Sequence, residues 1–159
     1  MNQNIDNHYW MNIVKTVAHA STCRVKIGCI IVQHNYIVGM GYLGSIHGAN
    51  HCTDVGCLLV DNHGIKGSSD TGKSCIRTIH AESNAVLKCT ARGSHNDGWL
   101  HCYSTYSPCL ECFKLLMQIG VRSFTYEKPY KDIYRDMLIS NLNIDNTCTA
   151  DTIRFNSYG

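Results

Sequence analysis

The sequence predicts an α/β domain with three layers, in which helices cover both faces of a mixed sheet of roughly five strands. Segments with helical periodicity alternate with short β-branched runs along the 159 residues, and this alternation is typical of helices packed on a sheet. A chain of this length can bury one substantial core. We therefore expect a single domain over residues 1–159, with its core in about residues 8–140.

The first predicted elements are a helix and a β-hairpin. Apolar side chains recur every three or four positions over residues 8–20, as on one face of a helix. Residues 27–32 form a β-branched run that predicts a buried strand, and residues 36–42 predict a second strand. Turn-forming residues at 33–35 lie between the two strands, so we expect them to pair as a hairpin.

A long stretch without periodicity follows at residues 43–77. It is rich in Gly and holds His51, Cys52, Cys57 and Cys75. A structureless stretch of this length is unusual inside a compact domain. We therefore expect this segment to be ordered by something other than its own core.

The second half of the chain again alternates between helix and strand patterns. The predicted helices cover residues 80–91, 109–119 and 131–140, and the predicted strands cover 99–105, 121–126 and about 142–144. Gly93 follows the first of these helices and Pro108 precedes the second, as is typical of helix ends and starts. The tail at 145–159 is polar, and we expect it to be partly disordered.

Two short motifs concentrate the chemistry of the chain. The first supplies His80 and Glu82, and the second supplies Cys109 and Cys112 behind Pro108. Imidazole nitrogen and thiolate sulfur are ligands that tetrahedral zinc prefers, and three protein ligands leave one position for water, as in catalytic sites. Both motifs lie at predicted helix starts, where partial positive charge favours thiolates.

In this order, the two motifs resemble the H-x-E…P-C-x-x-C signature of zinc-dependent nucleobase deaminases. The C-x-x-C pair alone would also fit a structural zinc knuckle or a redox pair, so these alternatives stay open. In a deaminase, zinc would lower the pKa of a bound water, and Glu82 would pass the proton of that water to the ring nitrogen. After attack at C4 of the cytosine, Glu82 would protonate the leaving amine.

Four further stretches resemble bacterial and phage deoxycytidylate (dCMP) deaminases of the cytidine deaminase superfamily. They cover residues 21–28, 41–45, 51–57 and 75–85, within a similarity that extends from about residue 8 to about residue 140. The resemblance implies a cytidine-deaminase-like fold and the conversion of dCMP to dUMP for thymidylate synthesis. It also implies a homohexamer that is activated by dCTP and inhibited by dTTP with Mg²⁺.

The same resemblance makes Tyr42, Leu43 and Gly44 a nucleotide-contacting effector loop. The family usually has Gly-Tyr-Asn-Gly where this chain has Gly-Tyr-Leu-Gly. An Asn amide makes several hydrogen bonds that a Leu side chain cannot replace. We therefore expect Leu43 to change either a substrate contact or the response to effectors.

Four cysteines match the family positions that hold a second zinc ion: Cys23, Cys52, Cys57 and Cys75, with His51 as an alternate ligand. A closed site with four ligands would order residues 43–77. Unpaired thiols are the alternative. Three of the remaining cysteines lie on predicted strands and helices and are expected to be small apolar filler: Cys29, Cys89 and Cys102.

A monophosphate substrate needs cationic partners, and Arg24, Lys26 and Lys131 are the candidates. By resemblance, Arg24 and the Tyr130–Lys131 pair lie near the phosphate and base of the substrate, and Asn84 lies near the sugar. The alternatives are solvated surface cations and a structural Tyr.

Composition limits the other classes of function. The formal net charge of +2 is too small for a dedicated nucleic-acid binder, so we expect no stable nucleic-acid partner. No run of about 18 apolar residues predicts a membrane span, and the polar N-terminus lacks a signal-peptide core. Ten Cys beside nine His favour metal binding in a reducing cytoplasm over disulfides. Two alternatives to a dCMP deaminase stay open: a zinc deaminase of dCTP or cytidine, and a non-catalytic, zinc-ordered interaction module.

Overall fold

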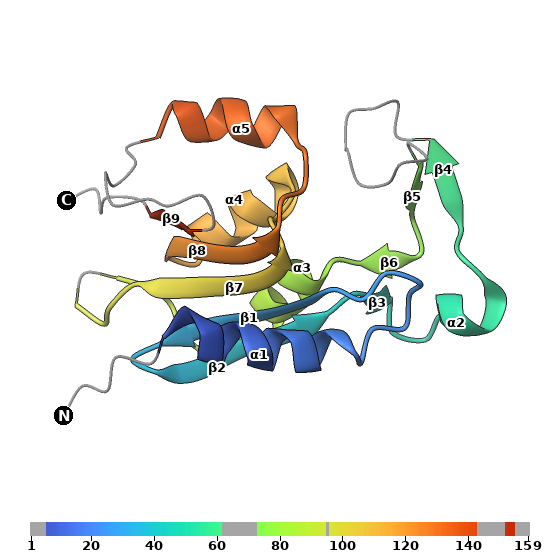
Figure 1. The fold of residues 1–159 in the computed structure, drawn as a ribbon, viewed down its shortest axis with the longest axis horizontal. Coiled ribbons are helices and arrows are strands. Elements are labelled where there is room, and N and C mark those ends of the chain that lie inside the picture. Colours follow the sequence, from blue (N-terminus) through green and yellow to red (C-terminus); the bar gives the residue numbers. More distant parts are fainter. Residues whose placement is uncertain (1–5, 62–72, 95, 143–151, 155–159) are drawn as a thin grey trace.

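The computed structural model describes residues 6–61, 73–94, 96–142 and 152–154. Its larger elements, in chain order, are α1 (Asn7–Ala18), β1 (Gly28–Gln33), β2 (Tyr36–Tyr42), α3 (Ala81–Leu87), β7 (Leu100–Tyr106), α4 (Leu110–Gln118), β8 (Val121–Lys128), α5 (Ile133–Ser140) and β9 (Thr152–Arg154). Helix α1 covers one face of the central sheet, and α3 and α4 cover the other (Figure 1). The predicted three-layer α/β fold is therefore confirmed.

The central sheet has five strands in the order β2-β1-β7-β8-β9. Strands β1 and β2 pair as the predicted antiparallel hairpin, and β1 also runs antiparallel to β7. Strands β7 and β8 are parallel and are joined through α4, whereas β9 pairs antiparallel with β8. The sheet is thus mixed, and its single parallel pair contributes the strand that leads into the C-x-x-C motif.

Helix α1 packs closely on the first strand. Asp6 caps it by accepting a hydrogen bond from the amide of Tyr9 at 2.9 Å. Trp10 and Val14 on its inner face join a buried cluster with residues of β1 and β7. A Cβ atom at Gly28 would lie 2.6 Å from the Val14 carbonyl oxygen, so the absence of a side chain there allows the helix to approach the strand.

Helix α3 also packs closely on the sheet, and this contact fixes the position of the motif that holds His80 and Glu82. A Cβ atom at Gly41 of β2 would lie 2.3 Å from the Ala81 carbonyl oxygen and 2.4 Å from the Ala85 amide. Ala81 and Ala85 are fully buried, so α3 meets the sheet through small residues on both sides. This contact places the start of α3, with His80 as its N-cap, at the edge of the sheet where β7 ends.

The segment at 43–77 contains more structure than its sequence predicts. It forms β3 (Gly44–Ser45), α2 (Cys52–Val55), β4 (Leu59–Asp61) and β5 (Lys73–Cys75), and it leads into β6 (Thr78–Ile79). Strand β3 pairs with β6 and β4 pairs with β5, and the β4–β5 pair stands away from the body of the domain (Figure 1). These elements are too short for a period to be recognised in the sequence.

Two element boundaries differ from the prediction. Helix α3 ends at Leu87, because the chain beyond it turns back to the sheet and the amide of Thr90 donates to the Val38 carbonyl at 2.9 Å. Leu142 belongs to the turn that ends α5, and the rest of the strand predicted at 142–144 lies outside the described residues. The last strand is instead β9, within the tail that we expected to be polar and partly disordered. Its pairing with β8, rather than an apolar pattern, stabilises it.

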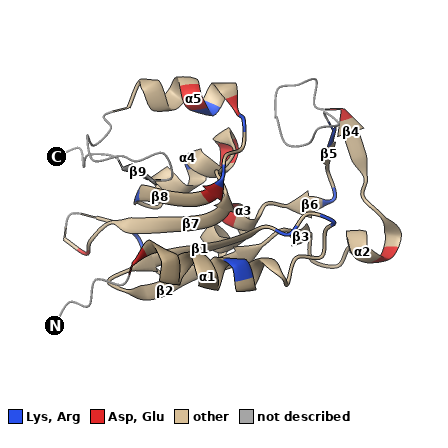
Figure 2. Cartoon of the chain, viewed as in Figure 1, with Lys and Arg blue, Asp and Glu red and all other residues tan. Residues whose placement is uncertain are grey.

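Acidic and basic residues are interspersed over the elements rather than gathered on one of them (Figure 2). Within the described ranges, no helix has both the length and the apolar character needed to cross a membrane.

Candidate active site

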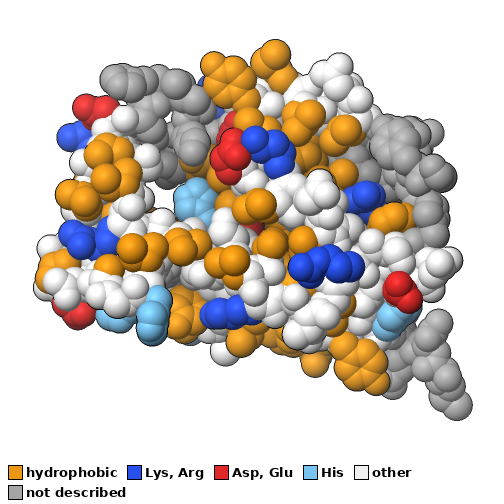
Figure 3. Space-filling view, turned by 180° about the vertical axis from the view of Figure 1, so that it is seen from behind, with side chains coloured by type: hydrophobic (Ala, Val, Ile, Leu, Met, Phe, Trp, Pro, Cys, Tyr) orange, Lys and Arg blue, Asp and Glu red, His pale blue; other side chains and the backbone are white. Residues whose placement is uncertain are grey.

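A cavity of about 320 Å³ opens at the carboxyl end of β7. Its walls come from the loop before β1, from β5 and β6, from the start of α3, and from the turn between β7 and α4. Seen from behind, the surface is hollowed between the arm that carries β4 and β5 and the body of the domain (Figure 3). The carboxyl ends of strands are common ligand-binding positions in α/β sheets.

His80, Cys109 and Cys112 come together at this cavity, and the first two of them line it. His80 is the N-cap of α3, Cys109 is the N-cap of α4, and Cys112 lies in the first turn of α4. The Nδ1 atom of His80 lies 3.4 Å from the Sγ atom of each cysteine. Tetrahedral zinc with ordinary bond lengths separates a nitrogen ligand from a sulfur ligand by about 3.6 Å. The three donor atoms therefore have the types and spacing that fit one zinc ion.

The two thiols have unequal proton affinities. A hydrogen bond from Cys112 and the interaction with His80 together lower the pKa of the Cys109 thiol to about 4, against the opposing effect of burial. The same hydrogen bond and burial raise the pKa of Cys112. Ser83, whose Oγ lies 3.4 Å from the Cys112 sulfur, has the opposite effect on this thiol. The lowered pKa of Cys109 favours the thiolate, which is the form of cysteine that binds a metal.

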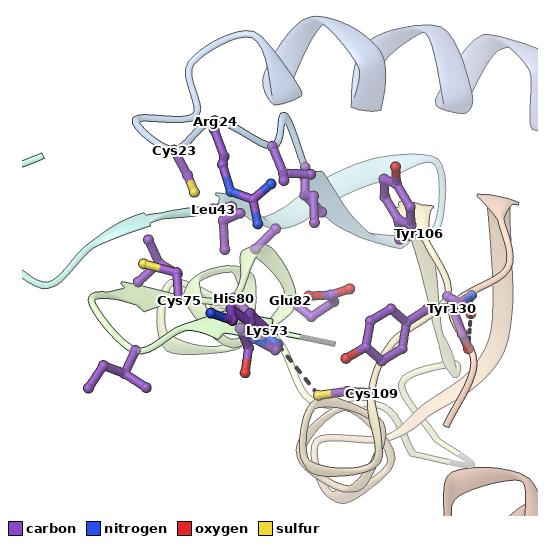
Figure 4. Close-up of a pocket in the computed structure, with 17 residues that line it drawn as sticks. Cys23, Arg24, Leu43, Lys73, Cys75, His80, Glu82, Tyr106, Cys109 and Tyr130 are labelled. Atoms are coloured by element: carbon purple, nitrogen blue, oxygen red, sulfur yellow. Dashed lines mark hydrogen bonds between the residues drawn. The ribbon is translucent and has the colours of Figure 1, made fainter. Parts of the chain in front are cut away.

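Glu82 is buried beside these donors, with only 4% of its surface exposed. Its Oε1 accepts a hydrogen bond from Ser104 at 3.2 Å, and Figure 4 shows its carboxylate turned into the same space as His80 and Cys109. Burial raises the pKa of Glu82, and the electrostatic interaction with His80 opposes this effect. A buried carboxyl group of raised pKa can both accept and donate a proton near neutral pH.

The second cysteine group is also brought together. The Sγ atoms of Cys23, Cys52 and Cys57 lie within 4.8 Å of one another. The Cys23 and Cys57 sulfurs are 3.9 Å apart, and the Cys52 and Cys75 sulfurs are 3.7 Å apart. Two thiolates on tetrahedral zinc are separated by about 3.8 Å, whereas a disulfide needs about 2.05 Å. The spacing of Cys23, Cys52 and Cys57 therefore fits one metal ion, with Cys75 outside this group of three but next to Cys52. His51 is exposed and also lies outside the group.

The other cysteines divide into two cases. Cys29 and Cys102 are buried in the core with their sulfurs 3.6 Å apart, and Cys89 packs against the edge of that core. This placement is that of apolar filler. Cys148 lies outside the described residues.

The residues predicted to contact substrate do not all reach the cavity. Arg24 and Tyr130 line it, and both side chains point inward in Figure 4. Lys26 donates to the Ser21 carbonyl at 2.6 Å and lines a separate hollow instead. Lys131 is exposed and belongs to neither lining, and Asn84 donates through Nδ2 to the Tyr42 carbonyl at 2.9 Å. The roles predicted for Lys26, Lys131 and Asn84 stay predictions.

Sequence reasoning missed two residues that line the cavity. Lys73 reaches it from β5, and Tyr106 reaches it from the end of β7. Lys73 lies in the stretch without periodicity, so no pattern indicated which way it would face. Tyr106 directly precedes the second motif, and its position at the carboxyl end of a predicted strand was the available signal.

The predicted effector loop forms part of the same wall. Tyr42 ends β2 and Gly44 begins β3, so Leu43 lies between two strands. Leu43 is 7% exposed, packs with Cys23 and Cys52, and lines the cavity. Its amide donates to the Ile27 carbonyl at 2.9 Å, and its carbonyl accepts from Ser21 Oγ at 2.7 Å. Leu43 thus contributes apolar surface next to the second cysteine group.

Comparison with known proteins gives this geometry a family context. Residues 4–128 match the family model described as the cytidine and deoxycytidylate deaminase zinc-binding region. The chain is 40% identical over 126 residues to ComE operon protein 2 of Bacillus subtilis (strain 168), covering 79% of this chain and 60% of that protein. It is 30% identical to the deoxycytidylate deaminase of Schizosaccharomyces pombe (strain 972 / ATCC 24843), covering 77% of this chain and 37% of that protein. The chain therefore spans less than two thirds of the length of these two relatives.

A phage relative is matched over most of its length, and a solved structure shares the fold. The deoxycytidylate deaminase of Mycobacterium phage D29 is 30% identical, with 77% of this chain and 94% of that protein covered. A structure of dCMP deaminase from the cyanophage S-TIM5 in complex with dCMP and dUMP superposes with a TM-score of 0.63 at 23% identity, covering 87% of this chain and 94% of the other. On the family match and these similarities, the chain belongs to the cytidine and deoxycytidylate deaminase family.

Proposed function

We propose that the protein is a zinc-dependent deaminase that hydrolyses dCMP to dUMP and ammonia. The observation that carries this proposal is the set of three donors, His80, Cys109 and Cys112, whose spacing fits zinc beside the buried Glu82. The deoxycytidylate deaminases among the relatives support dCMP as the substrate.

The residues at the cavity can each take a separate role in the reaction. Zinc held by His80, Cys109 and Cys112 would supply a water whose pKa is lowered toward neutrality. Glu82 takes a proton from this water and delivers it to N3 of the cytosine ring while a C4–O bond forms. Glu82 then takes the proton of the new C4 hydroxyl group and delivers it to the amino group as the C4–N bond breaks, so that ammonia leaves and a C4 carbonyl remains. The hydrogen bond from Ser104 holds the carboxylate in place for both transfers.

Apolar and aromatic side chains make up part of the cavity lining. Val25, Ile27 and Leu43 line one side, and Tyr106 and Tyr130 line the other. Aromatic rings there can pack against a flat pyrimidine. The resulting slot suits a single base at the Glu82 carboxylate.

We place the substrate phosphate at Arg24. This residue lines both the main cavity and a second hollow of about 470 Å³ whose walls also carry Lys15, Lys26 and Lys128. A base at Glu82 can therefore direct its 5′-phosphate toward a region with several cations. Arginine also offers two parallel donors to a phosphate group.

The second cysteine group is proposed as a structural zinc site. Cys23 comes from the loop before β1, whereas Cys52, Cys57 and Cys75 come from the segment at 43–77. A metal bound by all four would join this segment to the body of the domain. Four further parts of the proposal rest on the sequence and its resemblance alone. They are a single domain over 1–159, assembly as a homohexamer, regulation by dCTP and by dTTP with Mg²⁺, and a cytoplasmic location.

An ultraviolet assay with dCMP, cytidine, dCTP and deoxyadenosine tests the proposed function. We expect hydrolysis of dCMP with much less conversion of the other three. Conversion of cytidine or dCTP instead would keep the chemistry and change the substrate. If zinc binds and no nucleotide is deaminated, the protein is a zinc-ordered interaction module and the proposal is wrong.

A further inference from the structure

The first turn of α5 contacts the turn that carries Cys109. Asp132, the N-cap of α5, is only 2% exposed. Its Oδ2 accepts a hydrogen bond from the amide of Leu110 at 2.9 Å, and its Oδ1 accepts one from the amide of Arg135 at 3.0 Å. Leu110 is the first residue of α4 and directly follows Cys109. One buried carboxylate thus links the starts of two helices.

Arg135 holds the other side of the same cysteine. Its Nη1 donates to the Pro108 carbonyl at 2.7 Å and to Ser107 Oγ at 3.0 Å. Ser107 Oγ also accepts a hydrogen bond from the amide of Tyr130 at 2.6 Å. The residues immediately before and after Cys109 are therefore both fixed by the first turn of α5.

These contacts are strong for physical reasons. Hydrogen bonds to an ionised carboxylate and from a guanidinium are charge-assisted, and they strengthen where water is excluded. The N-termini of α4 and α5 both carry partial positive charge, and this charge lies next to the Asp132 carboxylate. A side chain that must coordinate a metal has to be held within about 0.5 Å of its working position. Contacts on both flanks of Cys109 can provide that restraint.

We infer that Asp132 is a positioning residue, which holds Cys109 and Cys112 at the spacing that the metal requires. The inference rests on the proposed function only in taking His80, Cys109 and Cys112 as the metal site. Asp132 does not touch the cavity, so its effect reaches the metal through the amide of Leu110. This role is distinct from capping α5, which needs only the contact to Arg135.

Two substitutions at Asp132 separate positioning from capping. Asp132→Ser keeps a good N-cap for α5 but shortens the side chain, so the contact to Leu110 is lost. Asp132→Asn keeps the size but places an NH₂ group against one of the two amides that Asp132 now accepts from. Asp136→Asn is the matched control, because this exposed carboxylate pairs with the same Arg135 and, within the described part of the chain, makes no hydrogen bond to α4.

The measurement is the rate at which a chromogenic chelator removes zinc from the full-length, zinc-loaded protein. The release phase that belongs to the active site is the one missing from His80→Ala. In this phase we expect zinc to leave Asp132→Ser and Asp132→Asn about 10-fold faster than the parent, with no change for Asp136→Asn. The cobalt-substituted Asp132→Ser protein should also show an altered visible absorption spectrum, while its Tm stays close to that of the parent.

Release from Asp132→Ser at the parental rate, with an unchanged cobalt spectrum, would overturn the inference. Equal acceleration in Asp136→Asn would also overturn it, because a general loosening of α5 would then explain the effect. If His80→Ala removes no release phase at all, the metal assignment under the proposed function is wrong, and the inference is lost with it. The release assay needs no nucleotide, so a wrong substrate leaves this test intact.

Discussion

The Nδ1 atom of His80 lies 3.4 Å from the Sγ atom of Cys109, although the two residues are 29 positions apart and cap different helices. Each N-cap position turns a side chain away from its helix and toward the carboxyl end of β7. The site therefore depends on how α3 and α4 pack on the sheet.

Replacing Glu82 by Gln removes the proton carrier while keeping the shape of the side chain. We expect kcat for dCMP to fall by about 10²- to 10⁴-fold, because the amide cannot accept and return a proton. Zinc content measured by mass spectrometry should stay at the parental value. Glu111→Gln is the control, since Glu111 is an exposed residue of α4 that pairs with Lys114 at 2.9 Å. A Glu82→Gln protein that keeps most of its activity contradicts the mechanism.

Replacing Cys75 by Ser tests the second metal site. The parental protein should hold about two zinc ions per chain, and the variant about one, because a hydroxyl is a poor zinc ligand. Cys89→Ser changes a thiol outside both cysteine groups and should leave the zinc content unchanged. A parental content of about one zinc removes the second site from consideration.

Replacing Arg24 by Met tests the phosphate contact. We expect kcat/KM for dCMP to fall by about 10- to 100-fold, because a charge-assisted hydrogen bond is lost, while the slow reaction of deoxycytidine is unchanged. Lys131→Met is the control, because Lys131 lines neither hollow. If Lys131→Met gives the selective loss and Arg24→Met does not, the phosphate lies elsewhere than we propose.

Replacing Gly41 by Ala tests the packing of α3. The new Cβ would lie 2.3 Å from the Ala81 carbonyl oxygen, so α3 must move. We expect the free energy of unfolding in urea to fall by about 3 kcal/mol. Gly48→Ala, at a φ of 84° with open space around it, should cost about 1 kcal/mol through backbone strain alone. Equal losses for the two variants would mean that α3 adapts to the added methyl group.

The sequence predicts those helices and strands that are long enough for a hydrophobic periodicity to be recognised. Helix α1 and strands β1 and β2 lie close to their predicted bounds, because amphipathic spacing and β-branched runs determine them. Strand β9 could not be predicted, because pairing with the edge of β8 stabilises a polar segment.

The residues of the candidate site also fall into those that the sequence predicts and those that it does not. His80, Glu82, Cys109 and Cys112 are recognisable because their chemistry imposes a fixed local spacing. Residues that act through tertiary contacts carry no such spacing. Ser104 reaches Glu82 from 22 positions away, and Asp132 reaches Leu110 across the same separation, so only the folded chain identifies them.

The arm that carries β4 and β5 has a consequence for how the proposed deaminase can be altered. Residues 73–76 and Thr78 form one side of the cavity, whereas the reacting groups lie on helices anchored to the sheet. Substitutions at Lys73, Ser74 and Ile76 can therefore reshape that side of the cavity without changing the donors His80, Cys109 and Cys112, while Cys75 keeps its place in the second cysteine group. For an engineer who wants a deaminase for a different pyrimidine, these three positions are the first to vary.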